Sequence, residues 1–350
     1  MGEKKKTVAL LVPGFPANEA DTTCIPFLQQ FCLAFVRTRP DIELQVISFQ
    51  YPFSKGDYLW NGIHVYCAGG NQHKYNRLLT WTRVFIQLLK IRKKDELVII
   101  NSFWMTECSL VGQWFARLFN IKQIACIAGQ DALVTNKYLP FINFKKLEVI
   151  ALSENLVNTF YKSTGFKIQH IIPSGIDISK VKPTNEKRTI DILGVGALTQ
   201  LKNYSLFIEL LNDLKKYRPD IKACIIGKGE QRDLLKEKIK SCGLAHTIEL
   251  SGELPQETVL TYMQKSKILL HTSSYEGQST VMMEALACGL SVVCFDVGRV
   301  HIEDRIIACT DRDDMLNTLK NLLSTTLSYE PLILQTNDDM AKGFLNIYGI

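Results

Sequence analysis

The sequence predicts a two-domain α/β protein in which each domain is a doubly wound parallel sheet. Its 350 residues are enough for two domains of roughly 100–200 residues each. Short apolar runs of strand length alternate with amphipathic runs of helix length, and this alternation stops once and then restarts. Because the strand-like runs lack polar alternation, we expect both faces of each sheet to be buried beneath helices.

The first series of elements ends at Gly175. Strands are expected at Thr7–Val12, Glu43–Phe49, Glu96–Asn101, Ile121–Ile127, Glu148–Leu152 and Ile168–Ile172. Helical patterns cover Thr23–Arg37 and a run that ends with Leu89–Lys94. Pro173-Ser174-Gly175 then stops the pattern, and the polar stretch Lys180–Arg188, which contains Pro183, follows it. These features place an N-terminal domain over residues 1–175.

The second series restarts after this boundary. Its expected strands are Thr189–Val195, Ile221–Ile226, Thr247–Leu250, Ile268–His271, Ser291–Phe295 and a last one near Ile306–Ala308. They predict a second doubly wound domain over residues 176–330. A helix at about Asn337–Ile347 lies in the remaining segment, 331–350. Two such domains that face one another leave a cleft at the carboxyl ends of their strands, where ligands bind in this class of fold.

Composition excludes several classes of protein. The chain is 46% hydrophobic, which is too high for a disordered protein, and no run approaches 18 consecutive apolar residues. None of the ten cysteines forms a C-x-x-C pair, and the six histidines show no metal-ligand spacing. Lys4–Lys6 before Val8–Val12 imitates a signal peptide, but Pro13 ends that apolar run, so we expect a first buried strand and a cytoplasmic protein.

Charge is divided unevenly between the two halves. Of the net +6, residues 1–175 carry +8 (20 basic, 12 acidic) and residues 176–350 carry −2 (21 basic, 23 acidic). Only the N-terminal half is therefore expected to meet an anionic surface. The basic residues are not interleaved with aromatic ones and no reader motif is present, which argues against nucleic-acid binding.

The densest group of reactive side chains follows the expected strand Ile268–His271. Glu276 lies in a polar turn, and a helix is expected to start near Ser279 and Thr280, which are good N-cap residues. The free N–H groups of that first turn form an anion site. Glu284 lies eight positions after Glu276, inside the helix. Capping and solvation could explain one of these carboxylates, but both together after a buried strand favour a ligand site.

This segment resembles the Glu-x7-Glu signature of the retaining GT-B glycosyltransferases of family four, also called group 1. Three further segments resemble elements of that family in order and spacing: Ile172–Asp177, Gly194–Leu198 with Lys202-Asn203, and Ile225–Glu230 with Arg232 and Leu235. The resemblance is strong over about residues 145–300. It reaches residues 1–145 only in outline, through Pro13-Gly14 and Asp131.

The resemblance implies a GT-B fold, in which an acceptor-side and a nucleotide-sugar-binding domain face one another and the last helix packs back on the N-terminal domain. It implies that Glu276 contacts the donor sugar, that Glu284 contacts the nucleotide ribose, and that Lys202 binds the diphosphate. It assigns catalysis to Glu276 and Lys202 and places Asp131 on the acceptor side. The other donor-binding residues that it implies are Gly14, Gly196, Gly277, Ser279 and Thr280. Neither a metal nor a separate cofactor is expected, because the nucleotide-sugar is a substrate.

Two departures from the family pattern leave alternatives open. Ala197 stands where the family usually has arginine, and Ala128 stands where it often has histidine. Losing a guanidinium removes a bidentate phosphate contact. The leading hypothesis is a retaining glycosyltransferase that acts on a saccharide or lipid-linked acceptor in surface polysaccharide or glycolipid assembly. The alternatives are a non-catalytic nucleotide-sugar-binding partner of an assembly complex and an epimerase of GT-B shape.

Two weaker motifs suggest other kinds of site. Gly194–Thr199 lacks the third glycine of a dinucleotide-binding loop, so a dehydrogenase is disfavoured. Asp311–Asp314 resembles a metal-binding D-x-D motif, but it precedes a helical run, where acidic residues are routine.

The segment Asn76–Lys94 combines leucine, tryptophan and phenylalanine with six basic residues. A basic amphipathic helix of this kind can lie on an anionic membrane surface. The competing interpretation is an ordinary helix that packs its apolar face on the sheet. A peripheral position at the inner face of the plasma membrane is therefore one hypothesis for this chain.

Overall fold

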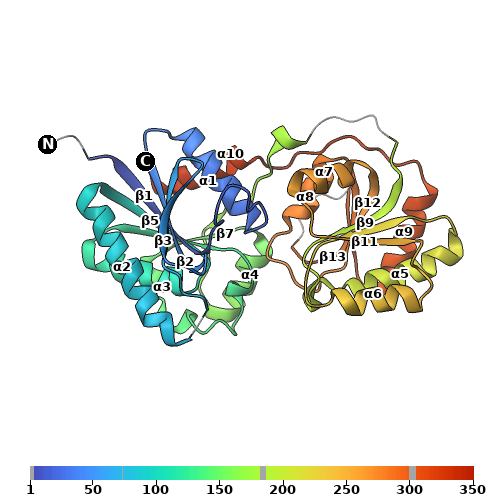
Figure 1. Cartoon of the computed structure of the whole chain (residues 1–350), viewed down its shortest axis with the longest axis horizontal. Helices are drawn as coiled ribbons and strands as arrows, with labels where there is room; N and C mark the ends of the chain where they lie inside the picture. The colour runs from blue at the N-terminus through green and yellow to red at the C-terminus, as the bar shows by residue number, and fades with distance from the viewer. Residues whose placement is uncertain (1–3, 73, 182–186, 299–304) are drawn as a thin grey trace. The chain divides into compact units, whose positions relative to one another are not determined.

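The computed structural model describes residues 4–72, 74–181, 187–298 and 305–350. The chain divides into two compact units, Met1–Gly175 with Gln335–Ile350, and Ile176–Leu334 (Figure 1). Part of the predicted boundary stretch, residues 182–186 with Pro183, lies outside the described residues, as do His73 and His301. The fold class predicted from the sequence, α/β with two mostly parallel sheets, is confirmed.

The sheet of the N-terminal unit has eight strands in the order β3-β4-β2-β1-β5-β6-β7-β8. They are β1 (Lys6–Gly14), β2 (Glu43–Tyr51), β3 (Gly56–Trp60), β4 (Ile63–Cys67), β5 (Glu96–Phe103), β6 (Lys122–Ile127), β7 (Glu148–Ala151) and β8 (His170–Ile171). One edge of this mostly parallel sheet runs the other way, because β3 pairs antiparallel with β4. Asn61 and Gly62 join these two strands with φ of 47° and 78°, which suits the two-residue hairpin turn that Asn-Gly favours.

Helices cover both faces of this sheet, and successive side chains of β1 point alternately into the two layers of core between sheet and helices. Val8, Leu10 and Val12 belong to the core beneath α1 (Pro26–Thr38), α4 (Glu154–Thr164) and α10 (Asn337–Tyr348). Ala9 and Leu11 belong to the core beneath α2 (Arg77–Lys94) and α3 (Glu107–Phe119), which Figure 1 shows together below the sheet. A strand that is buried on both faces reads as a continuous apolar run, as this one does.

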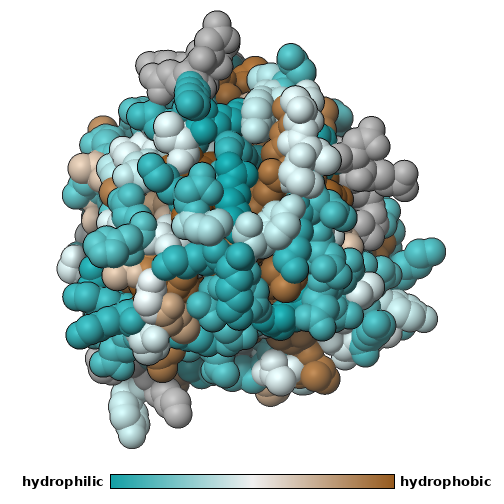
Figure 2. All heavy atoms as spheres, turned by 90° about the vertical axis from the view of Figure 1, so that its right-hand side faces the viewer, coloured by the Kyte–Doolittle hydropathy of each residue, from teal (hydrophilic) through white to brown (hydrophobic). Residues whose placement is uncertain are grey.

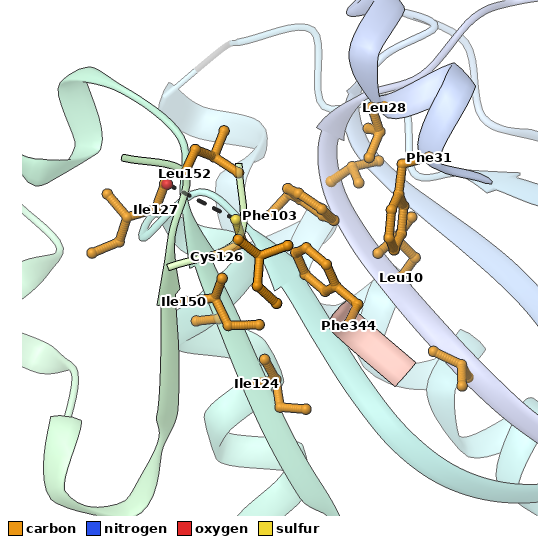
Figure 3. Close-up of a cluster of buried hydrophobic side chains, with 14 of the residues drawn as sticks. Leu10, Leu28, Phe31, Phe103, Ile124, Cys126, Ile127, Ile150, Leu152 and Phe344 are labelled. Atoms are coloured by element: carbon orange, nitrogen blue, oxygen red, sulfur yellow. Dashed lines mark hydrogen bonds between the residues drawn. The ribbon is translucent and has the colours of Figure 1, made fainter. Parts of the chain in front are cut away.

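Helix α10 completes the core of the N-terminal unit although it ends the chain. Phe344 projects from it toward Phe103 and Phe31, with ring centroids 5.5 and 4.9 Å away (Figure 3). The helix begins with a capping box between Thr336 and Asp339, which satisfies backbone N–H groups at its start. The Cβ of any larger residue at Gly175 would lie 2.2 Å from the Thr336 carbonyl oxygen, so glycine permits this return of the chain.

The sheet of the C-terminal unit has six parallel strands in the order β11-β10-β9-β12-β13-β14. They are β9 (Ile190–Val195), β10 (Ala223–Ile226), β11 (Ile248–Gly252), β12 (Ser266–His271), β13 (Ser291–Phe295) and β14 (Ile306–Cys309). The helices of the unit are α5 (Tyr204–Tyr217), α6 (Arg232–Ser241), α7 (Gln256–Gln264), α8 (Thr280–Ala287) and α9 (Arg312–Ser324). The chain leaves β9 in one direction and returns on its other side as β12, so the topological switch point lies between these two strands.

The two faces of this second sheet are also buried. Helices α5, α6 and α9 cover one face, and α7 and α8 cover the other. The outer surface drawn in Figure 2 is mostly hydrophilic, with apolar atoms in small separate groups. Short 3-10 helices complete the fold at Lys74–Asn76, Gln130–Ala132, Leu139–Phe141, Phe144–Lys146, Ile178–Lys180 and Gln200–Lys202. Within the described ranges, no helix combines the length and the apolarity needed to cross a bilayer.

Candidate donor-binding site

The switch point between β9 and β12 is lined by a glycine-rich turn. Gly196 and Gly227, which follow β9 and β10, have φ of 152° and 153°, values that residues with side chains rarely adopt. A Cβ at Gly227 would lie 1.9 Å from the Gly196 carbonyl oxygen, and one at Gly229 would lie 2.3 Å from that of Leu198. The two loops therefore touch backbone to backbone, and only glycine permits this contact.

Lys202 is held at the end of the turn that follows β9. Its carbonyl oxygen accepts a 2.8 Å hydrogen bond from Thr272 Oγ1, and the Leu201 carbonyl accepts one of 2.9 Å from the Ser274 N–H. These bonds tie the loop after β9 to the loop after β12, so residues 70 or more positions apart in the sequence lie side by side. This tie brings Lys202 to Glu276.

Lys202 and Glu276 form an ion pair through Nζ and Oε1. The side chains are 24% and 14% exposed, so the pair is shielded yet still reachable from solvent. His271 Nε2 lies 3.2 Å from the same Glu276 oxygen. Burial alone would raise the pKa of Glu276, but the hydrogen bond from His271 and the charge of Lys202 outweigh it and lower this pKa to about 2. Glu276 is therefore a carboxylate at any physiological pH.

Helix α8 begins directly beside this pair. Ser279 is its N-cap residue, and the Ser279 N–H donates to the Gly298 carbonyl at 3.1 Å. The Ser279 hydroxyl makes no capping bond and lies instead 3.3 Å from His271 Nε2. Thr280 opens the helix, and the first N–H groups of a helix generally have no acceptor within it. Of those in α8, the Met282 N–H donates to the Ser279 carbonyl at 3.2 Å. Together with Lys202, this helix end can attract a phosphate group.

Glu284 lies one helix turn further on and belongs to a different set of contacts. Its Oε1 accepts a 2.7 Å hydrogen bond from Gln256 Nε2, and Gln256 Oε1 accepts one of 3.2 Å from Lys180 Nζ. Burial raises the pKa of Glu284, against the opposing effects of Gln256 and Lys180. Glu276 and Glu284 thus occupy the same strand–turn–helix unit but differ in partners and in electrostatic setting.

The two remaining candidates, Gly14 and Asp131, belong to the N-terminal unit. Gly14 ends β1, and the following Phe15 N–H donates to the Tyr51 carbonyl. The Asp131 carboxylate accepts from the backbone N–H groups of Met105 and Gly129, both at 2.7 Å, and of Ala128 at 3.2 Å. Burial raises the pKa of Asp131 to about 6, although these three bonds favour the charged form. The carboxylate therefore shapes its own loop, whatever else it binds.

The structure also adds residues that the motifs do not single out. His271 lies behind Glu276, Gln256 holds Glu284, and a Cβ at Gly298 would lie 2.3 Å from Glu276 Cβ. The acidic run at Asp311 caps α9, since its side chain accepts from the N–H groups of Asp313 and Asp314 at 2.9 Å. Over the described residues, no three His, Cys, Asp or Glu side chains gather closely enough to hold a metal ion.

Residues 176–302, which include this whole constellation in the C-terminal unit, match the family Glycosyl transferases group 1. The C-terminal unit carries the match to this family. The resemblance inferred from the Glu-x7-Glu segment is thereby confirmed. The family match spans β9 to β13 with the loops that carry Lys202, Glu276 and Glu284.

Several known proteins are similar to parts of this chain. The chain is 26% identical over 214 residues to the phosphatidylinositol N-acetylglucosaminyltransferase gpi3 subunit of Schizosaccharomyces pombe, covering 58% of this chain and 46% of that protein. It is 32% identical over 172 residues to a Campylobacter jejuni N-acetylgalactosaminyltransferase that acts on a diphospho-undecaprenol-linked saccharide, covering 47% of this chain and 45% of that protein. The chain thus matches under half the length of both relatives.

Solved structures of the same fold cover almost the entire chain. Sucrose-phosphate synthase from Thermosynechococcus elongatus has a TM-score of 0.74 at 15% identity, over 98% of this chain and 95% of that one. HepE of Anabaena, solved in complex with UDP, has a TM-score of 0.66 at 16% identity, over 98% and 94%. At such identities the likeness establishes the fold, which is GT-B.

Proposed function

We propose that this protein is a retaining glycosyltransferase that moves a sugar, of the hexose type, from a nucleotide-sugar to a saccharide or lipid-linked acceptor. The observation that carries the proposal is the pairing of Lys202 and Glu276 beside the first turn of α8. A nucleotide-sugar presents an anionic diphosphate next to a polyol. A lysine with helix N–H groups suits the diphosphate, and an ionised carboxylate suits the hydroxyls.

These groups can support the chemistry without a Lewis acid. As the nucleoside diphosphate departs, negative charge develops on its phosphate, where Lys202 and the α8 N–H groups would stabilise it. Retention follows if the departing phosphate accepts the proton of the acceptor hydroxyl on the same face of the sugar. Glu276 would orient the sugar ring, and Glu284 would contact the nucleotide ribose. Gly14, Gly196, Gly277, Ser279 and Thr280 would complete the donor site, with Asp131 on the acceptor side.

The activities of two relatives favour a lipid-linked acceptor. One relative acts on phosphatidylinositol and another on a diphospho-undecaprenol-linked saccharide. The UDP bound to a protein of the same fold, HepE, supports a donor that is a nucleoside diphosphate sugar. We therefore place this chain in surface polysaccharide or glycolipid assembly, which requires access to a membrane surface.

Helix α2 offers a surface for that access, because it has two apolar faces. Thr80, Val84 and Leu88 are buried against the sheet, whereas three apolar side chains on the opposite side face solvent: Leu78, Ile86 and Leu89. An ordinary packed helix buries one apolar face and exposes a polar one. The second face is continued on α3 by Trp114 and Leu118, and Trp114 packs edge-on against Trp81 of α2 at 5.4 Å.

The charge around this α2–α3 face selects an anionic membrane. Residues 77–94 contain six basic side chains and no acidic one, and Arg117 adds a further charge on α3. We propose that this face rests on anionic lipid, which would position the protein peripherally at the inner face of the plasma membrane. Its apolar residues would enter the interface, and its lysines and arginines would lie at the headgroups.

The membrane proposal is tested by sedimentation with vesicles of phosphatidylcholine, with and without phosphatidylglycerol. Binding is expected only to the anionic vesicles and is expected to weaken with salt. Each basic residue near the surface contributes about 1 kcal/mol, so Lys90→Gln with Lys93→Gln should weaken binding about 30-fold. Leu78→Ser with Ile86→Ser should also weaken it. Leu234→Ser should not, because this leucine is exposed to a comparable extent but lies in the C-terminal unit. Binding to both vesicle types alike, or to neither, would contradict the proposal.

The transferase proposal is tested with a donor panel of UDP-, GDP-, ADP- and dTDP-sugars, read first by thermal shift and then by nucleotide release. A donor at 100 times its Kd stabilises the fold by about 2.7 kcal/mol. Lys202→Ala should lower release by about 100-fold or more, whereas Lys216→Ala, on an exposed lysine of α5, should leave it unchanged. Binding without release, with acceptors supplied, would favour the non-catalytic alternative. Conversion of the donor without any acceptor would favour the epimerase.

A further inference from the structure

His271 ends strand β12 directly behind Glu276 and is almost completely buried, with 4% of its surface exposed. Its Nε2 lies within hydrogen-bond distance of three oxygens: Glu276 Oε1 at 3.2 Å, Ser279 Oγ at 3.3 Å and Ser273 Oγ at 3.4 Å. All three belong to the loop that leads into α8. A single ring nitrogen therefore contacts this loop before, at and after Glu276.

The neighbours of His271 fix its proton on Nε2. The ionised Glu276 carboxylate can only accept a hydrogen bond, so the nitrogen beside it must donate one. His271 Nδ1 is buried and has no partner among the described residues, so a second proton there would have no hydrogen-bond acceptor. Burial accordingly lowers the pKa of His271, despite the favourable effect of Glu276 on its charged form. The ring is neutral and donates through Nε2.

Glu276 is consequently enclosed on three sides. His271 donates to it from the strand beneath, and Lys202 pairs with it from the loop after β9. Gly298 lies against its aliphatic stem, where a Cβ would come within 2.3 Å of Glu276 Cβ. Of these three neighbours, Lys202 would be shared with a bound diphosphate. His271 is the partner whose contact a ligand does not compete for, because it is buried.

We propose that His271 is a positioning residue that holds the Glu276 carboxylate, through the Nε2 hydrogen bond, in the orientation that receives hydroxyl groups of the donor sugar. The inference rests on the proposed function of Glu276 and adds a residue to it. His271 itself would touch no substrate. Its loss should weaken recognition of the sugar and leave recognition of the nucleotide intact, because the diphosphate is bound by Lys202 and α8.

Three substitutions separate this role from simple packing. The amide nitrogen of His271→Gln can reach the position of Nε2, whereas that of His271→Asn reaches only the position of Nδ1, and His271→Leu has no donor. A hydrogen bond to a charged group is typically worth about 10- to 100-fold in affinity. We expect the leucine and asparagine variants to lose that much of the affinity for UDP-glucose relative to UDP, and the glutamine variant to recover most of it. The affinity for UDP should stay within about twofold in all three.

Calorimetric titration with UDP-glucose and with UDP measures these affinities whether or not the protein catalyses transfer. Where it does, kcat and KM are measured as well. Equal losses for UDP and UDP-glucose would show a packing role and overturn the proposal. The proposal would also be overturned if the asparagine variant preferred UDP-glucose over UDP as strongly as the glutamine variant does. The same holds if the leucine variant kept the wild-type preference for UDP-glucose over UDP.

A second measurement keeps this test apart from a failure of the proposed function. If the wild-type protein binds neither ligand, the donor assignment fails for UDP-sugars, and the hydrogen bond is then examined alone. The contribution of Glu276 is the difference in unfolding free energy that Glu276→Gln produces. Between pH 3 and pH 5 this difference should rise less in the His271→Leu background than in the wild-type protein. It should be restored in His271→Gln. An unchanged rise in His271→Leu would overturn the positioning role.

Discussion

The ion pair at the centre of the site makes a prediction about stability that requires no substrate. Glu276 has a pKa of about 2 in the folded protein, against 4.5 for an ordinary glutamate. Each pKa unit corresponds to about 1.36 kcal/mol, so ionised Glu276 stabilises the folded state by about 3 kcal/mol. The side chain is only 14% exposed, so screening by solvent removes little of this. The Lys202 ammonium and the His271 imidazole are the groups that produce it.

Because the pKa of Glu276 is lowered, its contribution to the unfolding free energy decreases as the pH falls. The contribution is fully present above the unfolded pKa of 4.5 and is lost as pH falls toward 2. The perturbation is Glu276→Gln, which keeps the shape of the side chain and removes its titration. The difference in unfolding free energy between wild-type protein and variant should be constant from pH 7 to about pH 5.5. It should shrink by about 1.4 kcal/mol at pH 3.5.

Urea unfolding followed by circular dichroism, at matched ionic strength, measures this difference. Glu284→Gln is a matched control of opposite sign. Burial raises the pKa of Glu284, so its ionisation costs stability, and the corresponding difference should fall as pH rises through and above 4.5. Parallel stability curves for wild-type protein and Glu276→Gln would refute the inferred geometry, because the carboxylate would then have no ionic partners in the folded state.

Further predictions concern the core, the thiols and the glycine-rich turn that follows β9. Phe344→Ala removes a fully buried ring and should destabilise the N-terminal unit by about 3–5 kcal/mol in urea unfolding, whereas Phe141→Ala, on a ring that is 70% exposed, should change it little. Eight of the ten cysteines are buried, so a thiol reagent should modify at most Cys24 and Cys242 before unfolding, and Cys242 first because burial raises the pKa of Cys24 to about 12. Ala197→Arg restores a guanidinium beside the Gly196 turn and should tighten nucleoside diphosphate binding about tenfold in calorimetry. A variant that binds no better would place the phosphates elsewhere.

Much of the fold could be predicted because parallel strands bury both faces. Their continuous apolar runs stand out in the sequence, and β5, β9 and β13 lie within two residues of the predicted bounds at each end. The sequence pattern does not reveal the β3–β4 hairpin. An edge strand such as Gly56–Trp60 mixes polar and apolar residues and shows neither the two-residue period of a half-buried strand nor the 3.6-residue period of a helix. Its indicator was local, the Asn61-Gly62 pair, which favours a two-residue turn.

The candidate site could be predicted in its parts but not in its contacts. The Glu276–Glu284 spacing follows from one strand–turn–helix segment, which the sequence shows directly. The pairing of Glu276 with Lys202 joins two loops 74 residues apart, and it depends on β9 and β12 being neighbours in the sheet. His271 carried no motif at all, because its significance lies in which nitrogen faces Glu276, and only the folded chain determines that.

The loss of arginine at position 197 bears on the choice between an active transferase and a non-catalytic relative. Ala197 is exposed on a turn whose path is set by its neighbours, since Gly227 and Gly229 meet the backbone of Gly196 and Leu198 at distances that only glycine allows. The shape of the loop therefore does not depend on the side chain at 197. The missing guanidinium removes one contact to phosphate, worth about 1.5–3 kcal/mol for a charged hydrogen bond. Lys202, Glu276 and the start of α8 are all in place. The expected consequence of Ala197 is therefore weaker donor binding with the chemistry retained.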